Sequence, residues 1–301
     1  MEQLNSSMVT FNVSSPGHPS NASWLSIHVV PMLVLSICFL IGVPGNISVI
    51  ILKPNWQHLS SVSQSLMLNL AISDLICLLP VPLLIYALLY TWNLGLVACK
   101  LIAYVLYCSV NCSLLIVTAL SVQRYLQVVH LQRCFDRVGK RKMLVLVWLL
   151  AMLLCIPTLL LQQVTADQNG MICARTQSSP AQLMAVQLVE SLKGFVYMSV
   201  VAFTYIALHR RVNQAAFFNN PQTTRLITTI IVTFFVLWMP YHITNVLGVA
   251  AHLLKNKGLS KFCIESQNIV SSLVIVNSCL NPLLYAFTSR IMCTVCQERE
   301  H

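Results

Sequence analysis

Seven long apolar stretches most strongly limit what this chain can fold into, because each could cross a lipid bilayer as one helix. A bilayer core needs about 20 mostly apolar residues per helical crossing. The stretches cover approximately residues 25–52, 62–89, 96–129, 142–162, 182–208, 223–254 and 264–287. The alternating segments of about ten residues that form membrane barrels are absent. The sequence therefore predicts an all-α membrane protein, a bundle of seven transmembrane helices.

The content of charged residues excludes a soluble fold. Hydrophobic residues make up 57 % of the chain of 301 residues, and only 9 % are Asp, Glu, Lys or Arg. An ordinary soluble domain carries about 25 % charged residues to cover its surface. The net charge of +10 would indicate a nucleic-acid partner in a soluble protein, so the positions of the basic residues decide its meaning.

The basic residues are divided unequally between the two sides of the predicted bundle. One side carries Lys53, Arg124, Arg133, Arg137, Lys140, Arg141, Lys142, Arg210, Arg211, Arg225, Arg290 and Arg299. The other carries Lys100, Arg175, Lys193, Lys255, Lys257 and Lys261. Connectors rich in Lys and Arg stay in the cytoplasm, so we expect an extracellular N-terminus and a cytoplasmic C-terminus, with no nucleic-acid partner.

The first 24 residues form a polar tail before the first apolar stretch. Asn5, Asn12 and Asn21 each begin an Asn-x-Ser tripeptide, the acceptor for N-linked glycans. The tail lacks the basic start and cleavage site of a signal peptide. We expect residues 1–24 to be an extracellular glycosylated tail, with the first span directing membrane insertion.

A single carboxylate, Asp74, lies inside the second span, where a charge is costly and indicates a functional site. It could be a protonated acid with a purely structural hydrogen bond. It could also bind a hydrated sodium ion, together with polar residues expected near it. These are Asn46, Ser113, Asn277, Ser278 and Asn281. No cysteine and histidine spacing predicts another metal, so sodium is the only expected cofactor.

Three motifs follow one another along the spans. Gln123-Arg124-Tyr125 closes span three, Phe234-x-x-x-Trp238-x-Pro240 lies in span six, and Asn281-Pro282-x-x-Tyr285 ends span seven. Together with Gly45-Asn46, Asp74 and Trp148, these motifs resemble those of the rhodopsin-like (class A) G-protein-coupled receptors. The resemblance extends from about residue 24 to residue 296, and implies a plasma-membrane receptor over 25–287 that activates heterotrimeric G proteins.

The resemblance also implies which residues form the activation switch. In the family the arginine matching Arg124 rearranges on activation and contacts the G protein, near the tyrosines matching Tyr205 and Tyr285. Pro240 and Pro282 are expected to kink their helices. Trp238 would lie below a ligand cavity, and bundle packing is its alternative role.

Two departures from the family pattern lead to expectations of their own. Gln123 replaces the usual acid before the arginine, and residues 220–225 contain no acid. A neutral hydrogen bond holds less firmly than a charge-assisted one, so we expect raised ligand-free signalling. Span five lacks the usual proline, which predicts a straighter helix.

The cysteines have distinct expected roles. Cys99 and Cys173 resemble the disulfide of the family, and Cys263 has no evident outer partner. Cys293 and Cys296 are candidates for palmitoylation on a short amphipathic membrane-surface helix over 288–301. Few hydroxyl groups follow Tyr285, so weak arrestin binding is expected.

Polar side chains near the outer ends of the spans are candidates for ligand contact. They are Tyr104, Tyr107, Asn111, Glu190, Lys193, His242, Asn245 and Gln267. Glu190 could instead pair with Lys193 one helical turn away. Span three lacks the aspartate of amine receptors, so an amine ligand is excluded.

The run from Leu237 to Asn245 resembles that of leukotriene B4 receptors and their chemoattractant relatives. This resemblance implies a lipid acid such as leukotriene B4, a basic cavity rim from Lys100, Arg175 or Lys193, and coupling to inhibitory G proteins in chemotaxis. Ala103, Asn111 and Gln162 replace a histidine, a tyrosine and an arginine of those receptors. A related lipid or a chemotactic peptide therefore stays open as the ligand.

The sequence lacks the features of two other function classes, the transporters and the membrane enzymes. A transporter would show internal repeats and broken helices at mid-membrane, which are absent from the sequence. An enzyme would need paired acids, a Ser-His pair or a histidine-rich metal cluster within the spans, and none is present. The sequence therefore favours a receptor.

Overall fold

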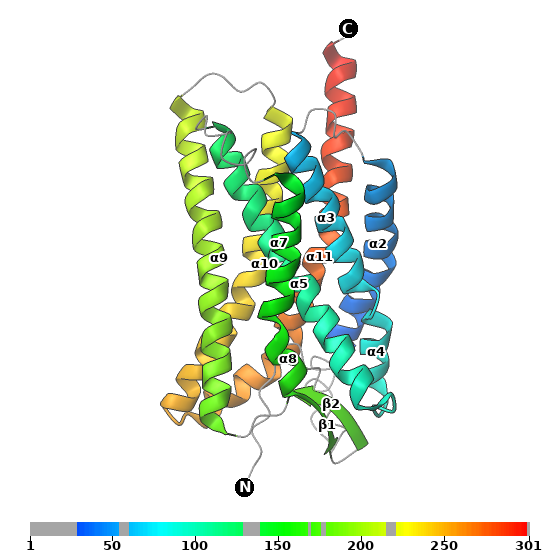
Figure 1. Cartoon of the computed structure of the whole chain (residues 1–301), viewed down its shortest axis with the longest axis vertical. Coiled ribbons are helices and arrows are strands. Elements are labelled where there is room, and N and C mark those ends of the chain that lie inside the picture. The colour runs from blue at the N-terminus through cyan, green and yellow to red at the C-terminus, as the bar shows by residue number, and fades with distance from the viewer. Residues whose placement is uncertain are drawn as a thin grey trace.

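The computed structural model describes residues 29–53, 60–128, 139–167, 170–175, 179–214 and 221–299. In chain order its elements are α2 (Val30–Leu52), α3 (Ser61–Leu78), α4 (Val81–Leu89), α5 (Gly95–Val128), α7 (Lys140–Leu154), α8 (Ile156–Leu161), β1 (Gln162–Asp167), β2 (Gly170–Arg175), α9 (Pro180–Gln214), α10 (Pro221–Leu253) and α11 (Lys257–Arg299). The tail with Asn5, Asn12 and Asn21 lies outside the described residues. Figure 1 shows an elongated helical bundle with a small β-hairpin at one end. We call this the hairpin end, and the opposite end, where α11 finishes, the C-terminal end.

The helices confirm the predicted bundle. Within the described ranges, six helical segments are long and apolar enough to cross a membrane: Val30–Leu52, Ser61–Ala87, Gly95–Gln123, Lys140–Leu161, Ala181–Ala207 and Ile231–Leu253. The seventh predicted span lies in α11, which packs against α2, α3 and α10. Large apolar side chains such as Leu40, Ile51 and Leu160 point away from the bundle. Their exposure is expected of a surface that faces lipid.

Prolines interrupt two of the spans. The second span divides into α3 and α4 at Pro80, and the fourth divides into α7 and α8 at Cys155, two residues before Pro157. Proline lacks the N–H that would continue the helical hydrogen bonds, and its ring displaces the preceding carbonyl. Pro240 and Pro282 lie inside continuous helices. The fifth span, α9, has no proline after its first residue and runs as one helix of 35 residues.

Close approach of α2 and α11 depends on a glycine. A Cβ atom at Gly45 would lie 2.9 Å from Cβ of Pro282, which is closer than side-chain atoms pack. Asn46 follows in the sequence and donates a hydrogen bond from Nδ2 to the carbonyl of Ser278, at 3.0 Å. The pair Gly45-Asn46 therefore joins the first and seventh spans.

The C-terminal segment continues the last span in the structure, and its role as a membrane-surface helix stays a prediction. The sequence predicted a separate membrane-surface helix over 288–301, whereas α11 continues without a break to Arg299 and extends past the other helices in Figure 1. Between Leu283 and Arg299 there is no glycine or proline. Without a residue that ends a helix, the backbone hydrogen bonds continue.

The hairpin at the end of the bundle was not predicted. Strands β1 and β2 pair antiparallel, with Gln162 opposite Arg175 and Val164 opposite Cys173. Cys173 forms a disulfide with Cys99 of α5, at a Cα–Cα distance of 5.6 Å, as expected. The hairpin is thereby attached to the start of α5 and lies over the interior of the bundle.

Candidate functional site

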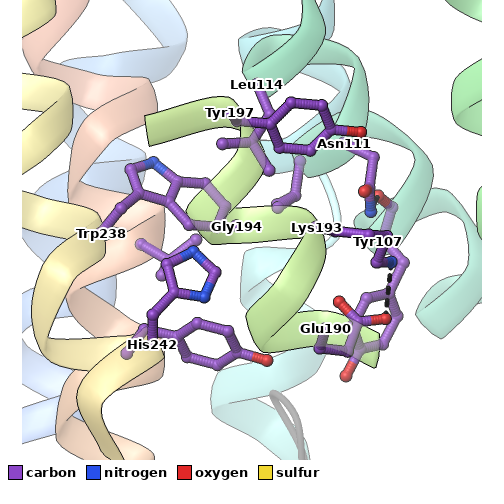
Figure 2. A pocket seen from close by; sticks show the side chains of 12 residues that line it. Tyr107, Asn111, Leu114, Glu190, Lys193, Gly194, Tyr197, Trp238 and His242 are labelled. Carbon is purple, nitrogen blue, oxygen red and sulfur yellow. Dashed lines mark hydrogen bonds and ion pairs between the residues drawn. The ribbon is translucent and has the colours of Figure 1, made fainter. Parts of the chain in front are cut away.

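A cavity opens inside the bundle toward the hairpin end, between α5, α9, α10 and α11. The space between its walls, including the part open to solvent, is about 400 Å³, and Figure 2 shows side chains from several helices converging on it. Its lining residues are Tyr107, Val110, Asn111, Leu114, Glu190, Lys193, Gly194, Tyr197, Trp238, Tyr241, His242 and Val274. Five of the residues proposed from the sequence for ligand contact therefore lie together: Tyr107, Asn111, Glu190, Lys193 and His242.

Three other residues proposed for ligand contact are placed elsewhere. The hydroxyl of Tyr104 donates to the carbonyl of Met152 in α7, at 3.2 Å. Helical periodicity places Tyr104 on the same stripe as Tyr107, but at its height α5 packs against α7 and α8. Asn245 and Gln267 are buried without lining the cavity.

Sequence reasoning missed six lining residues, which are Val110, Leu114, Gly194, Tyr197, Tyr241 and Val274. Most are apolar, and an apolar residue in an apolar helix carries no signal that separates a cavity wall from a lipid-facing surface. Tyr241 could have been found, because it follows the helix-kinking Pro240 and precedes His242. Trp238 was expected below the cavity and forms part of its wall.

Glu190 and Lys193 form the ion pair that was one interpretation of the sequence, and they also line the cavity, as the other interpretation expected. Lys193 Nζ donates to Glu190 Oε1 at 2.7 Å along one face of α9, and Figure 2 draws this ion pair at the cavity wall. The two side chains are only 18 % and 17 % exposed, so each neutralises the charge of the other in a site with little water.

An aromatic column follows one face of α10. The ring centroids of Phe234 and Trp238 are 5.9 Å apart, and Trp238 stacks on the imidazole of His242, also at 5.9 Å with planes inclined by 20°. The three residues are spaced by four, which places them on one side of the helix. The column leads from the cavity toward the C-terminal end of the bundle.

The His242 imidazole lies directly against Gly194 of α9, as Figure 2 shows. A Cβ atom at Gly194 would overlap the ring, so only glycine leaves room for this packing. His242 is 3 % exposed, and neither ring nitrogen has a hydrogen-bond partner within the part of the chain that the structure describes. Buried polar atoms are normally satisfied, which makes these nitrogens candidates for ligand contact.

Asp74 is fully buried where α2, α3, α5 and α11 meet. Ser113 Oγ donates to its Oδ1 at 2.9 Å, and Asn281 Nδ2 donates to its Oδ2 at 2.6 Å. Asn277 and Ser278 are buried in the adjoining part of α11. All the residues proposed for the sodium site thus lie in neighbouring helices.

The chemistry of this cluster fits a small cation. Asp74 makes no ion pair with a basic residue among the described side chains. Asn46 Oδ1 is buried and accepts no hydrogen bond from the described residues. Carboxylate, amide and hydroxyl oxygens are ligands that hard cations prefer.

At the C-terminal end of the bundle, Gln123 joins α5 to the start of α3. Its Nε2 donates to Ser60 Oγ at 2.7 Å, and its Oε1 accepts from Ser63 Oγ at 2.7 Å. Ser60 also caps α3 by accepting from the backbone N–H of Ser63, at 3.2 Å. We call these three residues the neutral clasp, because none of them carries a charge.

The remaining switch and cysteine positions are described in part. The Tyr125 ring packs edge-on against Phe203 of α9 at 6.0 Å, and Tyr205 lies half-buried on the same helix. The side chains of Arg124, Tyr285, Cys293 and Cys296 lie outside the described residues, although their backbones belong to α5 and α11. Cys263 is a buried free thiol, and burial raises its pKa.

Comparison with known proteins gives the family. Residues 45–285 match the model of the 7 transmembrane receptor (rhodopsin family), which is well over half of the chain. Leukotriene B4 receptor 1 of Homo sapiens is 32 % identical over 292 residues, covering 91 % of this chain and 81 % of that receptor. The C3a anaphylatoxin chemotactic receptor of Danio rerio is 30 % identical, covering 87 % and 72 %, and C-C chemokine receptor type 7 of Homo sapiens is 28 % identical, covering 86 % and 71 %. These relatives are receptors and not enzymes. With its seven spans, its cavity and its buried polar core, the chain belongs to the rhodopsin family of seven-transmembrane receptors, in the chemoattractant branch.

Proposed function

We propose that this receptor binds leukotriene B4 or a related eicosanoid at the cavity and activates G proteins of the inhibitory class in chemotactic signalling. The observation that carries the proposal is the composition of the cavity wall. Val110, Leu114 and Val274 offer apolar surface for a hydrocarbon chain, and His242 offers a donor and an acceptor for a hydroxyl group. The similarity to leukotriene B4 receptor 1 supports the same class of ligand.

The proposed orientation places the hairpin end outside the plasma membrane and the C-terminal end in the cytoplasm. The glycans expected on Asn5, Asn12 and Asn21 would then lie on the ligand side. Lipid attachment at Cys293 and Cys296 would lie on the G-protein side, together with Arg124 and Tyr285.

A panel of ligands on transfected cells tests the function. Calcium and cyclic-AMP responses are measured against eicosanoids and chemotactic peptides. We expect a dihydroxy eicosanoid acid to activate at the lowest concentration, and Glu190→Gln and His242→Ala to lower its potency about tenfold or more, as expected for lost hydrogen bonds in a buried site. Lys261→Gln changes an exposed residue of α11 and serves as the control. Activation by peptides alone would overturn the lipid assignment in favour of a peptide receptor.

We further propose that Asp74, Ser113, Asn277, Ser278 and Asn281 bind sodium in the inactive receptor. A cation held only in one state shifts the equilibrium toward that state. Replacing sodium with choline should therefore raise agonist affinity several-fold, and Asp74→Asn should abolish this dependence. Agonist affinity that is equal in the two salts for the wild-type receptor would contradict the proposal.

A further inference from the structure

We propose that Arg175 is the anchor for the ligand carboxylate, an inference that rests on the proposed lipid-acid ligand. Arg175 is the last residue of β2 and is only 4 % exposed. Its Nε has no hydrogen-bond partner among the described residues, and neither of the ion pairs found there includes it. Its guanidinium lies over the ring of Tyr107, with Cζ at 5.3 Å from the ring centroid.

A buried guanidinium without an anion is an incomplete site. Arginine is always charged at neutral pH, and removing its charge from water costs free energy that a carboxylate partner normally offsets. The face of an aromatic ring attracts the cation, but an N–H···π contact is much weaker than a hydrogen bond from the guanidinium to a carboxylate. An incoming carboxylate would supply both the opposite charge and the acceptor.

The other basic residues near the cavity are less suited to this role. Lys193 already donates to Glu190 at 2.7 Å, so a ligand carboxylate would have to compete with that ion pair. Lys100 is half-exposed next to Cys99, so water can solvate its charge without a ligand. Of the three basic residues expected at the rim, Arg175 is the one that is both buried and without a carboxylate partner among the described residues.

Arg175 lines neither cavity itself but contacts Tyr107, which lines both. Tyr107 lines the main cavity and also a second cavity, which Gln162 and Cys173 of the hairpin help to line and which spans about 450 Å³ including open solvent. Gln162, opposite Arg175 in the hairpin, lines the second cavity and has its Oε1 buried without a described partner. A carboxylate bound to Arg175 would therefore lie at the junction of the two cavities, with the hydrocarbon chain continuing along Tyr107.

The disulfide fixes this anchor. Cys173 precedes Arg175 by two residues on β2 and is bonded to Cys99 at the start of α5. Because Tyr107 lies two helical turns further along α5, both partners of the cation–π contact are held by the same helix. The anchor is thus preorganised before ligand binds, which reduces the entropy lost on binding.

The test compares leukotriene B4 with its methyl ester, which keeps the chain and hydroxyl groups but lacks the charge. Binding of both is measured on purified wild-type receptor, Arg175→Gln, Arg175→Lys and Lys261→Gln. We expect the wild type and Lys261→Gln to prefer the acid by about 10- to 100-fold, the range of a charge-assisted hydrogen bond. Arg175→Gln should bind the two ligands equally, and Arg175→Lys should keep a reduced preference for the acid.

Each outcome bears on one part of the inference. If the wild type prefers the acid and Arg175→Gln keeps the full preference, the anchor is wrong while the lipid-acid function stands. If the wild type binds neither compound, the proposed ligand and the anchor both fall. Arg175→Lys keeps the charge, so its preference for the acid tests the anchor even if Arg175→Gln does not reach the cell surface. An undiminished, wild-type preference for the acid in Arg175→Lys would then overturn it, because lysine cannot reproduce the planar contacts of arginine.

Discussion

At the scale of single residues, the contact between Gly194 and His242 sets the shape of the cavity. The imidazole occupies the space that any larger residue at position 194 would fill, and it stacks on Trp238 below. His242 can therefore lie where it does because Gly194 on the neighbouring helix has no side chain. A ligand that moves the ring must also change its packing on Trp238.

We predict that Gly194→Ala lowers agonist affinity by at least about tenfold, because the added methyl group displaces His242 from its place against α9. Gly258→Ala is the control, since a Cβ there would meet Asn256 Oδ1 at an ordinary 3.5 Å. The double variant Gly194→Ala/His242→Ala should be non-additive, with a coupling of about 0.5–3 kcal/mol in agonist binding. Strict additivity would show that the methyl group acts through another contact.

A site residue can be recognised from the sequence when its polarity differs from that of its neighbours in the helix. Asp74, Glu190 and His242 are polar residues in apolar helices, so each could be singled out from the sequence. Leu114 and Val274 resemble every other apolar residue of their helices and needed the packed structure. The buried Asn245 and Gln267 show the limit of this contrast, because they are as distinctive as His242 but do not line the cavity.

At the scale of elements, the neutral clasp replaces the charged interaction that the family usually forms before its arginine. Gln123 uses both its amide nitrogen and its amide oxygen on serines of α3, so α5 and α3 are linked by two short hydrogen bonds. The sequence predicted the loss of an acid at this position, but not the bonds to α3. The partners are about 60 positions away in the chain, and only the packed helices bring them together.

We predict that Gln123→Ala raises ligand-free nucleotide exchange on a G protein about fivefold or more, because the two lost hydrogen bonds contribute about 1 kcal/mol each to the packing of α5 on α3. Gln123→Asp should lower exchange below the wild-type level by giving Arg124 a charged neighbour. Exchange is measured at matched surface expression, with Ser65→Ala as control, since Ser65 bonds only within α3. Unchanged exchange in Gln123→Asp would contradict the expected raised basal signalling.

The Cys99–Cys173 disulfide holds the hairpin against the start of α5. Removing a native disulfide costs about 2–5 kcal/mol in small domains. We predict that Cys99→Ser/Cys173→Ser loses most agonist affinity, because β2 and Arg175 are no longer held over Tyr107. Radioligand binding on detergent-solubilised receptor measures the loss, and Cys263→Ser, which removes a free thiol, should bind as the wild type does. Normal affinity in the double variant would show that β1–β2 pairing alone positions the hairpin.

At the scale of the whole molecule, the cavity and the neutral clasp lie toward opposite ends of one bundle. The column of Phe234, Trp238 and His242 lies between them on α10, with residues on both sides of Pro240. Two sites coupled through one equilibrium must influence each other by the same factor. Agonist affinity therefore depends on whether a G protein is bound.

We predict that a bound inhibitory G protein tightens agonist binding by about 5- to 150-fold, the usual range of such coupling, and that a non-hydrolysable guanine nucleotide reverses the effect. Trp238→Leu should reduce this factor because it removes the aromatic contact on both sides, to Phe234 and to His242. Competition binding with and without nucleotide gives the factor. A value near one in the wild type would mean that the cavity and the C-terminal end are not coupled.

The architecture was more predictable than its irregularities. Bilayer thickness fixes the length of a span, so the seven helices could be predicted from hydropathy alone. The β-hairpin and the uninterrupted α11 could not, because the short β1 and β2 carry no clear alternation of apolar and polar residues and a helix end requires a specific breaking residue. The prolines at 80 and 157 gave visible signals for the breaks in the second and fourth spans.

Because the neutral clasp carries no charge, its strength depends little on pH or ionic strength. Exposed ion pairs weaken as ionic strength rises, since mobile ions screen them over about 8–10 Å. Glutamine and serine carry no net charge and do not titrate between acidic and alkaline pH. The link between α3 and α5 therefore keeps its strength when a cell acidifies or when its salt content changes, so sodium at Asp74 is left as the proposed route by which ions act on this receptor.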